Sequence, residues 1–101
     1  MSTILEEGDW EALARNILRA ELMRRGLSYA KLVEALAKIG VVETEAAIKN
    51  KVARGRFPFV FFLQAMVAIG ADWMQVPALD ALGRGEGLGS GGAQTLAKTK
   101  I

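Results

Sequence analysis

The side chains best suited to chemistry gather in residues 49–56, which read KNKVARGR. The segment has no acid, and its four cations are Lys49, Lys51, Arg54 and Arg56. Asn50 can form two hydrogen bonds with adenine, and lysine can reach guanine or a phosphate. Arg54 and Arg56 flank Gly55 and suit phosphate contacts rather than base contacts. The segment therefore predicts a surface that binds nucleic acid, although such a charge run also occurs on a merely solvated face.

Two smaller groups of polar residues precede this segment. Thr44 and Glu45 lie near the start of the same expected helix, where a glutamate can accept a hydrogen bond from cytosine. Ser28 and Tyr29, with Lys31 nearby, can offer hydroxyls or backbone N–H groups to a phosphate. Ser28 and Thr44 also suit helix caps and Tyr29 suits a half-buried ring, so both interpretations of each residue stay open.

The composition argues against catalysis. The chain has 101 residues with neither Cys nor His, which excludes thiol nucleophiles, zinc sites built from these ligands and an imidazole base. No pair of carboxylates lies in an apolar setting, and no Gly-rich loop has a phosphate-binding context. We expect a non-catalytic binding protein without cofactor or metal.

The sequence also indicates a compartment. The longest apolar stretch, residues 57–69, is interrupted by Gln64 and is shorter than the roughly 18 residues of a membrane span. The N-terminal residues MSTILEEGDW are acidic, whereas a secretory signal begins with positive charge. We expect a cytoplasmic protein, associated with the nucleoid if it binds DNA.

The elements that must position these residues are helices separated by Gly and Pro. Helical periodicity predicts four segments and a shorter fifth, at about residues 9–25, 28–40, 44–54, 58–70 and 72–82. Asp9 and Ser28 suit N-caps, and Gly55 suits the position after the third helix. The fourth helix is apolar nearly all round, so it is expected to be central in the core. The fold class is all-α, compact, with four or five helices.

The chain divides at Gly83. Residues 1–82 are expected to form one domain, and residues 83–101 a flexible tail, because six of the first ten tail residues are Gly. The net charge is +2, from 13 basic and 11 acidic residues. Without the tail the charges balance, so the charge of the body is polarised between an acidic start and the basic segment.

The relation between the second and third helices is the strongest feature. A short helix beginning GLS is followed by a turn and then by a third helix, which has Ile48 and Val52 inward and Lys49 and Asn50 outward. This arrangement would lay the third helix in a major groove of DNA. Here the chain resembles the Cro and phage-repressor helix-turn-helix domains, also called Xre-like, over residues 10–76. The stretches that carry the resemblance are RRGLSYAKLVEAL and VARGRFPFVFFLQAMVAIGADWMQV. The segment IKNKVARGRFPFVFFLQAMVAIG is also similar to small uncharacterised bacterial proteins with such domains.

The resemblance implies a lambda-repressor-like fold, operator binding on double-stranded DNA and transcription regulation, often as a dimer. The chain departs from the family in its longer turn, AKIGVVETEA, and in the spacing of four between Ile48 and Val52. A homodimer is a further hypothesis, because two half-sites multiply affinity and specificity. The residues expected at its interface are Trp73, Met74, Val76 and Leu79. Trp10 is expected in the core or at that interface.

Two other functions remain open at this point. The same fold can serve as a protein-interaction adaptor, antitoxin-like or polymerase-associated, that uses the acidic first helix and exposed Phe residues. It can also serve as a nucleoid-type protein that binds all DNA sequences alike. A stable protein complex without duplex preference distinguishes the first, and equal affinity for all duplexes distinguishes the second.

Overall fold

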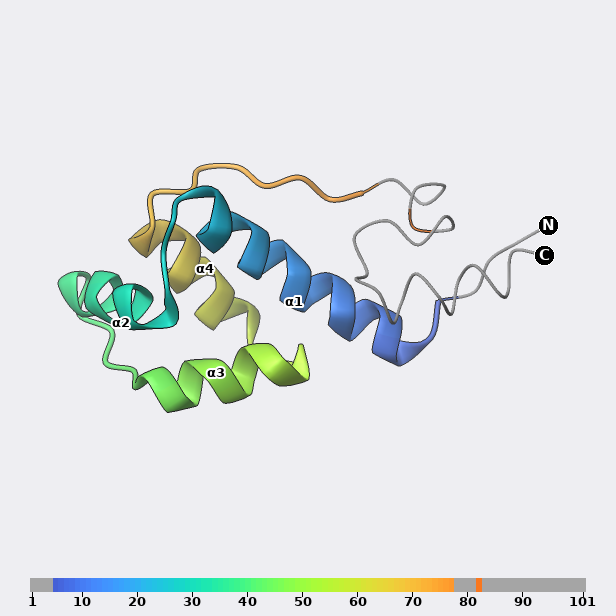
Figure 1. Ribbon diagram of the computed structural model, residues 1–101, viewed down its shortest axis with the longest axis horizontal. Helices are drawn as coiled ribbons and strands as arrows, with labels where there is room; N and C mark the ends of the chain where they lie inside the picture. Colours follow the sequence, from blue (N-terminus) through green and yellow to red (C-terminus); the bar gives the residue numbers. More distant parts are fainter. Residues whose placement is uncertain (1–4, 78–81, 83–101) are drawn as a thin grey trace.

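A computed structural model of the protein describes residues 5–77 and 82. Within this part the chain forms helices and no strands, which confirms the predicted all-α class. The four helices, shown in Figure 1, are α1 (Glu7–Arg24), α2 (Tyr29–Lys38), α3 (Glu45–Arg54) and α4 (Phe59–Ala68). The predicted tail, residues 83–101, lies outside the described residues, as does the end of the predicted 1–82 domain apart from Leu82.

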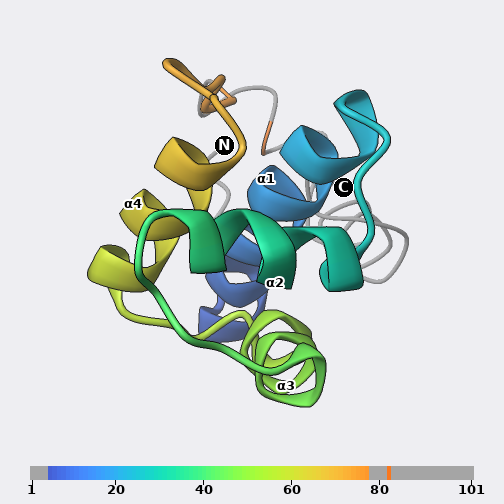
Figure 2. The same ribbon diagram turned by 90° about the vertical axis from the view of Figure 1, so that its left-hand side faces the viewer.

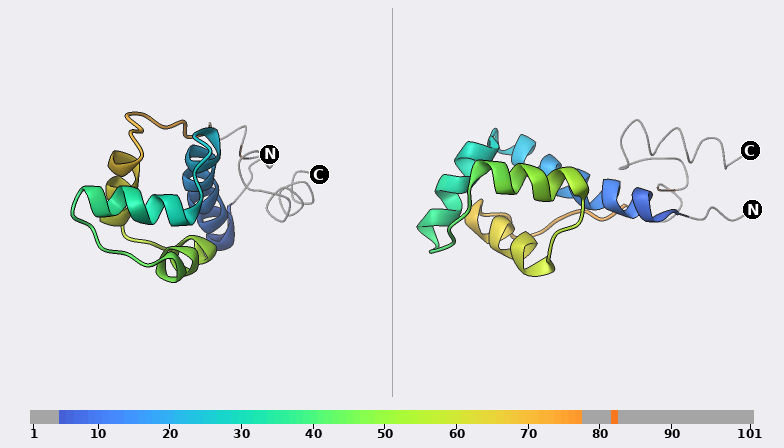
Figure 3. Two further views of the ribbon diagram at one scale, coloured as in Figure 1. Left: turned by 60° about the vertical axis from the view of Figure 1, so that its left-hand side comes forward. Right: turned by 90° about the horizontal axis from the view of Figure 1, so that it is seen from below.

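The helices form a compact bundle in which α3 lies at one edge. α2 packs on α4 and on α3, and α3 also packs on α1. Figure 2 shows α2 running across the view while α3 is seen nearly end-on, so the two helices cross steeply. In the left view of Figure 3, α1 and α4 stand on either side of α2, and α3 runs beneath them. One side of α3 is therefore free of other helices of the described chain.

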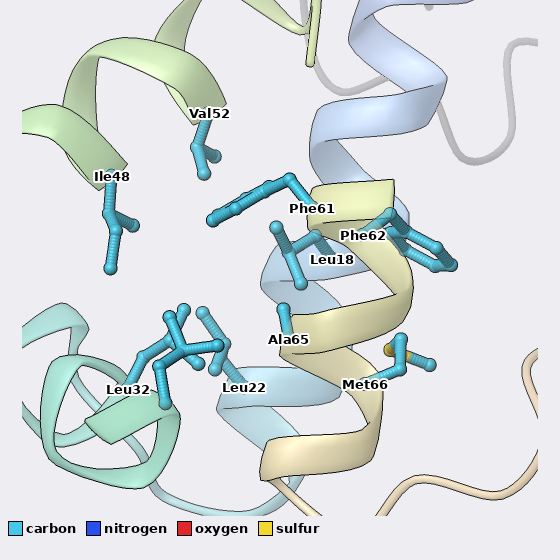
Figure 4. Packing of buried hydrophobic residues seen from close by; sticks show 10 residues of the cluster. Leu18, Leu22, Leu32, Ile48, Val52, Phe61, Phe62, Ala65 and Met66 are labelled. Carbon is cyan, nitrogen blue, oxygen red and sulfur yellow. The ribbon is translucent and has the colours of Figure 1, made fainter. Parts of the chain in front are cut away.

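The core is built by apolar side chains from all four helices. Figure 4 shows Ile48 and Val52 of α3 pointing toward Phe61 of α4 and toward leucines of α1 and α2. The buried set is Leu18, Leu22, Leu32, Leu36, Ile48, Val52, Phe61, Phe62, Ala65 and Met66. Within each helix these residues recur three or four positions apart, so one face of every helix is removed from water.

Short-range hydrogen bonds fix where the helices begin. The hydroxyl of Ser28 accepts from the backbone N–H of Lys31 at 3.2 Å, and that of Thr44 accepts from Ala47 at 3.0 Å. Both residues are N-caps, as their side chains predicted. The expectation for Asp9 was wrong. The helix begins earlier, at Glu7, because Glu6 and Asp9 form a capping box in which Asp9 accepts from the Glu6 N–H at 2.9 Å.

One acidic side chain of α1 is buried beside two arginines. The carboxylate of Glu21 accepts hydrogen bonds at 2.6 Å from both Arg24 and Arg25. Burial alone would raise the pKa of Glu21, but the hydrogen bonds and charges of the two arginines lower it below its ordinary value. These arginines therefore neutralise a buried carboxylate at the end of α1.

The expected fifth helix is absent from residues 71–77, which are irregular. Gly70, with a φ of 77°, ends α4, and Pro77 follows so closely that no helix of stable length fits between them. Instead the segment runs back along α1, and Gln75 and Pro77 line a pocket together with residues of α1. Residues 78–81 are not described. Leu82 is buried against Leu13 in a second, smaller apolar cluster.

The fourth helix is not central, which corrects a second expectation. Phe61, Phe62, Ala65 and Met66 are buried, but the opposite side of α4 is exposed although it too is apolar. The reason is that neighbouring helices lie on only one side of α4, which no periodicity can reveal in a segment that is apolar all round.

Candidate nucleic-acid interface

The exposed side of α3 presents polar side chains around two small ones. Ile48 and Val52 have no exposed surface, so the residues between and beside them point outward. The exposed residues are Glu45, Ala46, Lys49, Asn50, Ala53 and Arg54, and we call this set the α3 outer face. Ala46 and Ala53 lie seven positions apart along its middle and let another molecule approach the helix backbone closely. Sequence reasoning missed both alanines, although their spacing was readable.

Four of the predicted contact residues come together on the α3 outer face: Glu45, Lys49, Asn50 and Arg54. Lys49 makes no ion pair within the described residues, so its ammonium group is available. Nε of Arg54 donates to the backbone oxygen of Asn50 at 3.3 Å, which holds the arginine along the helix. The guanidinium of Arg54 makes no other hydrogen bond within the described part of the chain. The face thus offers two cations and one amide within about two turns of helix.

Lys51, a predicted contact residue, lies outside the α3 outer face. Its ammonium lies 2.6 Å from the carboxylate of Glu43 and 4.5 Å from the centre of the Phe61 ring. Only 29% of its side-chain surface is exposed. The rotation of 100° per residue turns Lys51 away from Asn50 and toward the loop before α3 and the start of α4. Within the described chain, the Lys51 ammonium is therefore held by Glu43 and Phe61 and is less accessible than that of Lys49.

Arg56 is also engaged within the protein and is not a free phosphate clamp. Its guanidinium forms ion pairs with both Glu7 and Glu11 of α1. The acidic start of the chain and the basic segment, which looked like two separate poles, thus meet in the fold. Their charges partly cancel, because α3 ends beside the first half of α1. Complementary charge in the two segments was the signal that sequence reasoning left unused.

The end of α3 is fixed against α1 by a close backbone contact. Gly55 has a φ of 65°, and a Cβ atom on it would lie 2.2 Å from the carbonyl oxygen of Glu11. Only glycine fits, for reasons of both conformation and space. Arg15 of α1 adds a hydrogen bond of 3.1 Å from its guanidinium to the carbonyl oxygen of Ala53. The α3 outer face is therefore held in a defined position.

Residues 10–74 match a protein family described as a domain of unknown function, DUF6471. The chain belongs to this family. The matched span contains α1 from its fourth residue onward and all of α2, α3 and α4. It therefore includes the α3 outer face and the contact that fixes it. No curated protein and no solved structure shows significant similarity to the chain.

A second group of predicted residues meets beside α3 in the DUF6471 domain. Ser28, Tyr29 and Glu45 line one groove where the starts of α2 and α3 approach the end of α1. Arg19 of α1 lines the same groove and was not predicted, because its position on the first helix gave no hint of this proximity. Lys31 is exposed and lies 3.7 Å from Glu34, and Thr44 acts as a cap. The groove thus joins the start of α3 to the start of α2, with polar side chains beside the apolar side chains of Leu22, Met23 and Leu27.

The predicted dimer residues of the DUF6471 domain follow α4. Trp73 and Val76 are exposed, and Met74 is partly exposed and lines an apolar pocket with Phe59 and Phe62. Leu79 lies outside the described residues. Trp10, expected in the core or at an interface, is half exposed on α1. Exposed apolar side chains thus occur where the sequence placed the dimer interface, and also on α4.

Two findings limit the chemistry of the DUF6471 domain. Within residues 5–77 and 82, no three acidic side chains gather closely enough to hold a metal ion. No helix in the described ranges has both the length and the apolar character of a membrane span.

Proposed function

We propose that this DUF6471 protein is a DNA-binding transcriptional regulator that places α3 in the major groove of a duplex. The observation that carries the proposal is the exposure of Lys49, Asn50 and Arg54 on one side of a helix whose other side is fully buried. The major groove admits one α-helix, and only outward side chains can reach base edges. In this proposal α2, the turn at residues 39–44 and α3 act as the helix-turn-helix.

Each residue of the α3 outer face has a role in this arrangement. Asn50 pairs with adenine, and Lys49 and Arg54 reach guanine or the flanking phosphates. Ala46 and Ala53 allow close approach and can touch a thymine methyl group. Glu45, at the start of the helix, accepts from cytosine and repels phosphate, which would favour some sequences over others.

The groove beside α3 supports the same orientation. Ser28 and Tyr29 start α2 next to Glu45, so the first turns of α2 and α3 open on one side of the molecule. Backbone N–H groups at the start of a helix suit phosphate oxygens, and Arg19 adds a positive charge there. A duplex lying along the α3 outer face would therefore meet positively charged groups on both flanks.

Selection from a pool of random duplexes with the full chain tests the proposal. We expect enrichment of one sequence motif, and affinity that falls steeply as salt rises. Substituting Lys49→Gln should weaken binding about tenfold, and Asn50→Ala should relax the preference at one base position. Lys38→Gln is the matched control, because it removes an equally exposed charge at the far end of α2.

The outcomes separate this function from its two rivals. Equal binding of all duplexes would replace regulation by non-specific DNA binding. No binding of any duplex at low salt would reject DNA as the partner and favour the protein adaptor. If Lys38→Gln weakened binding as much as Lys49→Gln, the face assigned to DNA would be wrong.

A further inference from the structure

The outer side of α4 is an apolar surface that nothing in the described chain covers. Phe59, Val60, Leu63 and Val67 are 66%, 63%, 46% and 66% exposed, and we call these four residues the α4 outer face. They stand at spacings of three and four, so they form one stripe along the helix. Neither α4 nor its flanks, from Phe57 to Ala71, contains a charged residue.

The stripe continues into an apolar pocket. Phe59 also lines this pocket, together with Phe57, Phe62 and Met74 and with Ala14 and Ile17 of α1. The lining is almost free of polar atoms, so water in the pocket finds few hydrogen-bond partners and is readily displaced. A ridge of side chains beside a pocket allows two such surfaces to interdigitate, which gives an interface its shape complementarity.

The extent of this surface matches one half of a protein interface. The four exposed side chains present roughly 300–450 Å² of apolar surface, the size of the largest patch on a typical monomer, and such patches often have a function. A standard interface buries about 800 Å² on each partner, and somewhat more than half of it is apolar. The α4 outer face with a polar rim is therefore sufficient for one partner's share.

We infer that the occupant of this surface is a second copy of the chain, paired through α4 about a two-fold axis near Leu63. A different protein would be selected by complementary charge, and this stripe offers none. The stripe is complementary to itself: it ends in a large ring at Phe59 and a small side chain at Val67. An antiparallel copy therefore places Phe59 against the partner's Val67, and large meets small at both ends.

Pairing through α4 leaves the α3 outer face uncovered in both copies. Figure 2 shows α4 on the left side of the molecule and α3 along its lower edge. The pair would thus carry two sets of Lys49, Asn50 and Arg54. The inference does not depend on DNA, because the apolar contact forms in its absence.

Sedimentation of the full chain at micromolar concentration, without DNA, tests the pairing. We expect a dimer that Val67→Glu dissociates, with the dissociation constant raised at least about tenfold, because a carboxylate would be removed from water. Val42→Glu is the matched control, since Val42 is 92% exposed in the loop between α2 and α3. A monomeric wild-type chain, or a dimer that responds equally to both substitutions, would overturn the inference.

A cross-link locates the two-fold axis without weakening the surface. The chain has no Cys, so Leu63→Cys introduces one thiol per copy. Near the axis this thiol meets its own counterpart within disulfide reach, and mild oxidation should convert most of the protein to a covalent dimer. Val42→Cys should stay largely monomeric under the same conditions. Equal cross-linking of the two variants would contradict pairing at α4, whatever the outcome of the DNA experiments.

Discussion

α3 and α4 are neighbouring helices of ten residues each that share one core and differ on their outer sides. Both bury one side in the same core, which contains the leucines of α1 and α2. Outside, α3 exposes Lys49, Asn50 and Arg54 around two alanines, whereas α4 exposes an aromatic ring and three aliphatic side chains. Packing of the core explains the inner sides of both helices and neither of the outer ones.

The difference indicates what each outer side contacts. A cation or amide is well hydrated, so the α3 outer face is stable in water and can meet an equally hydrated partner such as a phosphate backbone. Large apolar side chains on α4 lose about 1.5–3 kcal/mol each when they are exposed instead of buried. The two faces therefore suit partners of opposite character, one charged and one apolar.

The largest effect is expected where α3 is fixed against α1. Gly55→Ala would add a methyl group 2.2 Å from the Glu11 carbonyl oxygen at a φ of 65°, and no flexible side chain can move aside. We expect stability to fall by about 2–6 kcal/mol, from backbone strain and overpacking combined. Thermal unfolding measures the loss. DNA binding should suffer more than pairing, because α3 moves while α4 does not.

Gly26→Ala separates strain from steric clash. Gly26 has the same φ of 65°, but a Cβ atom there meets nothing within 4 Å. We expect a loss of about 1–2 kcal/mol from the left-handed conformation alone. Equal losses for the two variants would show that contact with α1 does not fix α3, and the α3 outer face would then lack its rigid support.

Raising the salt concentration should weaken duplex binding by the α3 outer face about a hundredfold more than pairing through the α4 outer face. Two copies with Lys49 and Arg54 on phosphates give four contacts, so duplex affinity should fall about 10²-fold between roughly 50 and 200 mM salt. Pairing through the uncharged α4 outer face should stay constant or strengthen, since apolar contacts are not screened. Fluorescence anisotropy and sedimentation in the same buffers measure both. If rising salt weakened pairing as much as it weakened duplex binding, charge would also govern pairing.

Sequence reasoning predicted the helices well, because their signals are local. Ser28 and Thr44 act as caps, and Ile48 and Val52 are buried. Each of these depends on residues three or four positions away, which a linear sequence displays directly. The start of α1 was misplaced by two residues, since Asp9 also fits the third position of a capping box.

The candidate site was predicted less well, because contacts between distant segments decide it. Arg56 pairs with Glu7 and Glu11, which lie 45 or more positions earlier, and no local pattern announces that pairing. The exposed side of α4 escaped prediction for a related reason. An apolar helix at the edge of a bundle and one at its centre have the same composition, and only their neighbours distinguish them.

The smallest expected effect distinguishes two lysines of α3: Lys51, which pairs with Glu43, and Lys49, which is exposed. Lys51→Met removes the ion pair with Glu43 and the contact above Phe61, so stability should fall by about 0.5–2 kcal/mol while duplex affinity changes little. Lys49→Met, two positions earlier, should change stability by less than about 0.5 kcal/mol and weaken duplex binding. Denaturant unfolding and duplex titration on both variants make the comparison. The reverse pattern would place Lys51 on the contact surface, with its ammonium released from Glu43 when DNA binds.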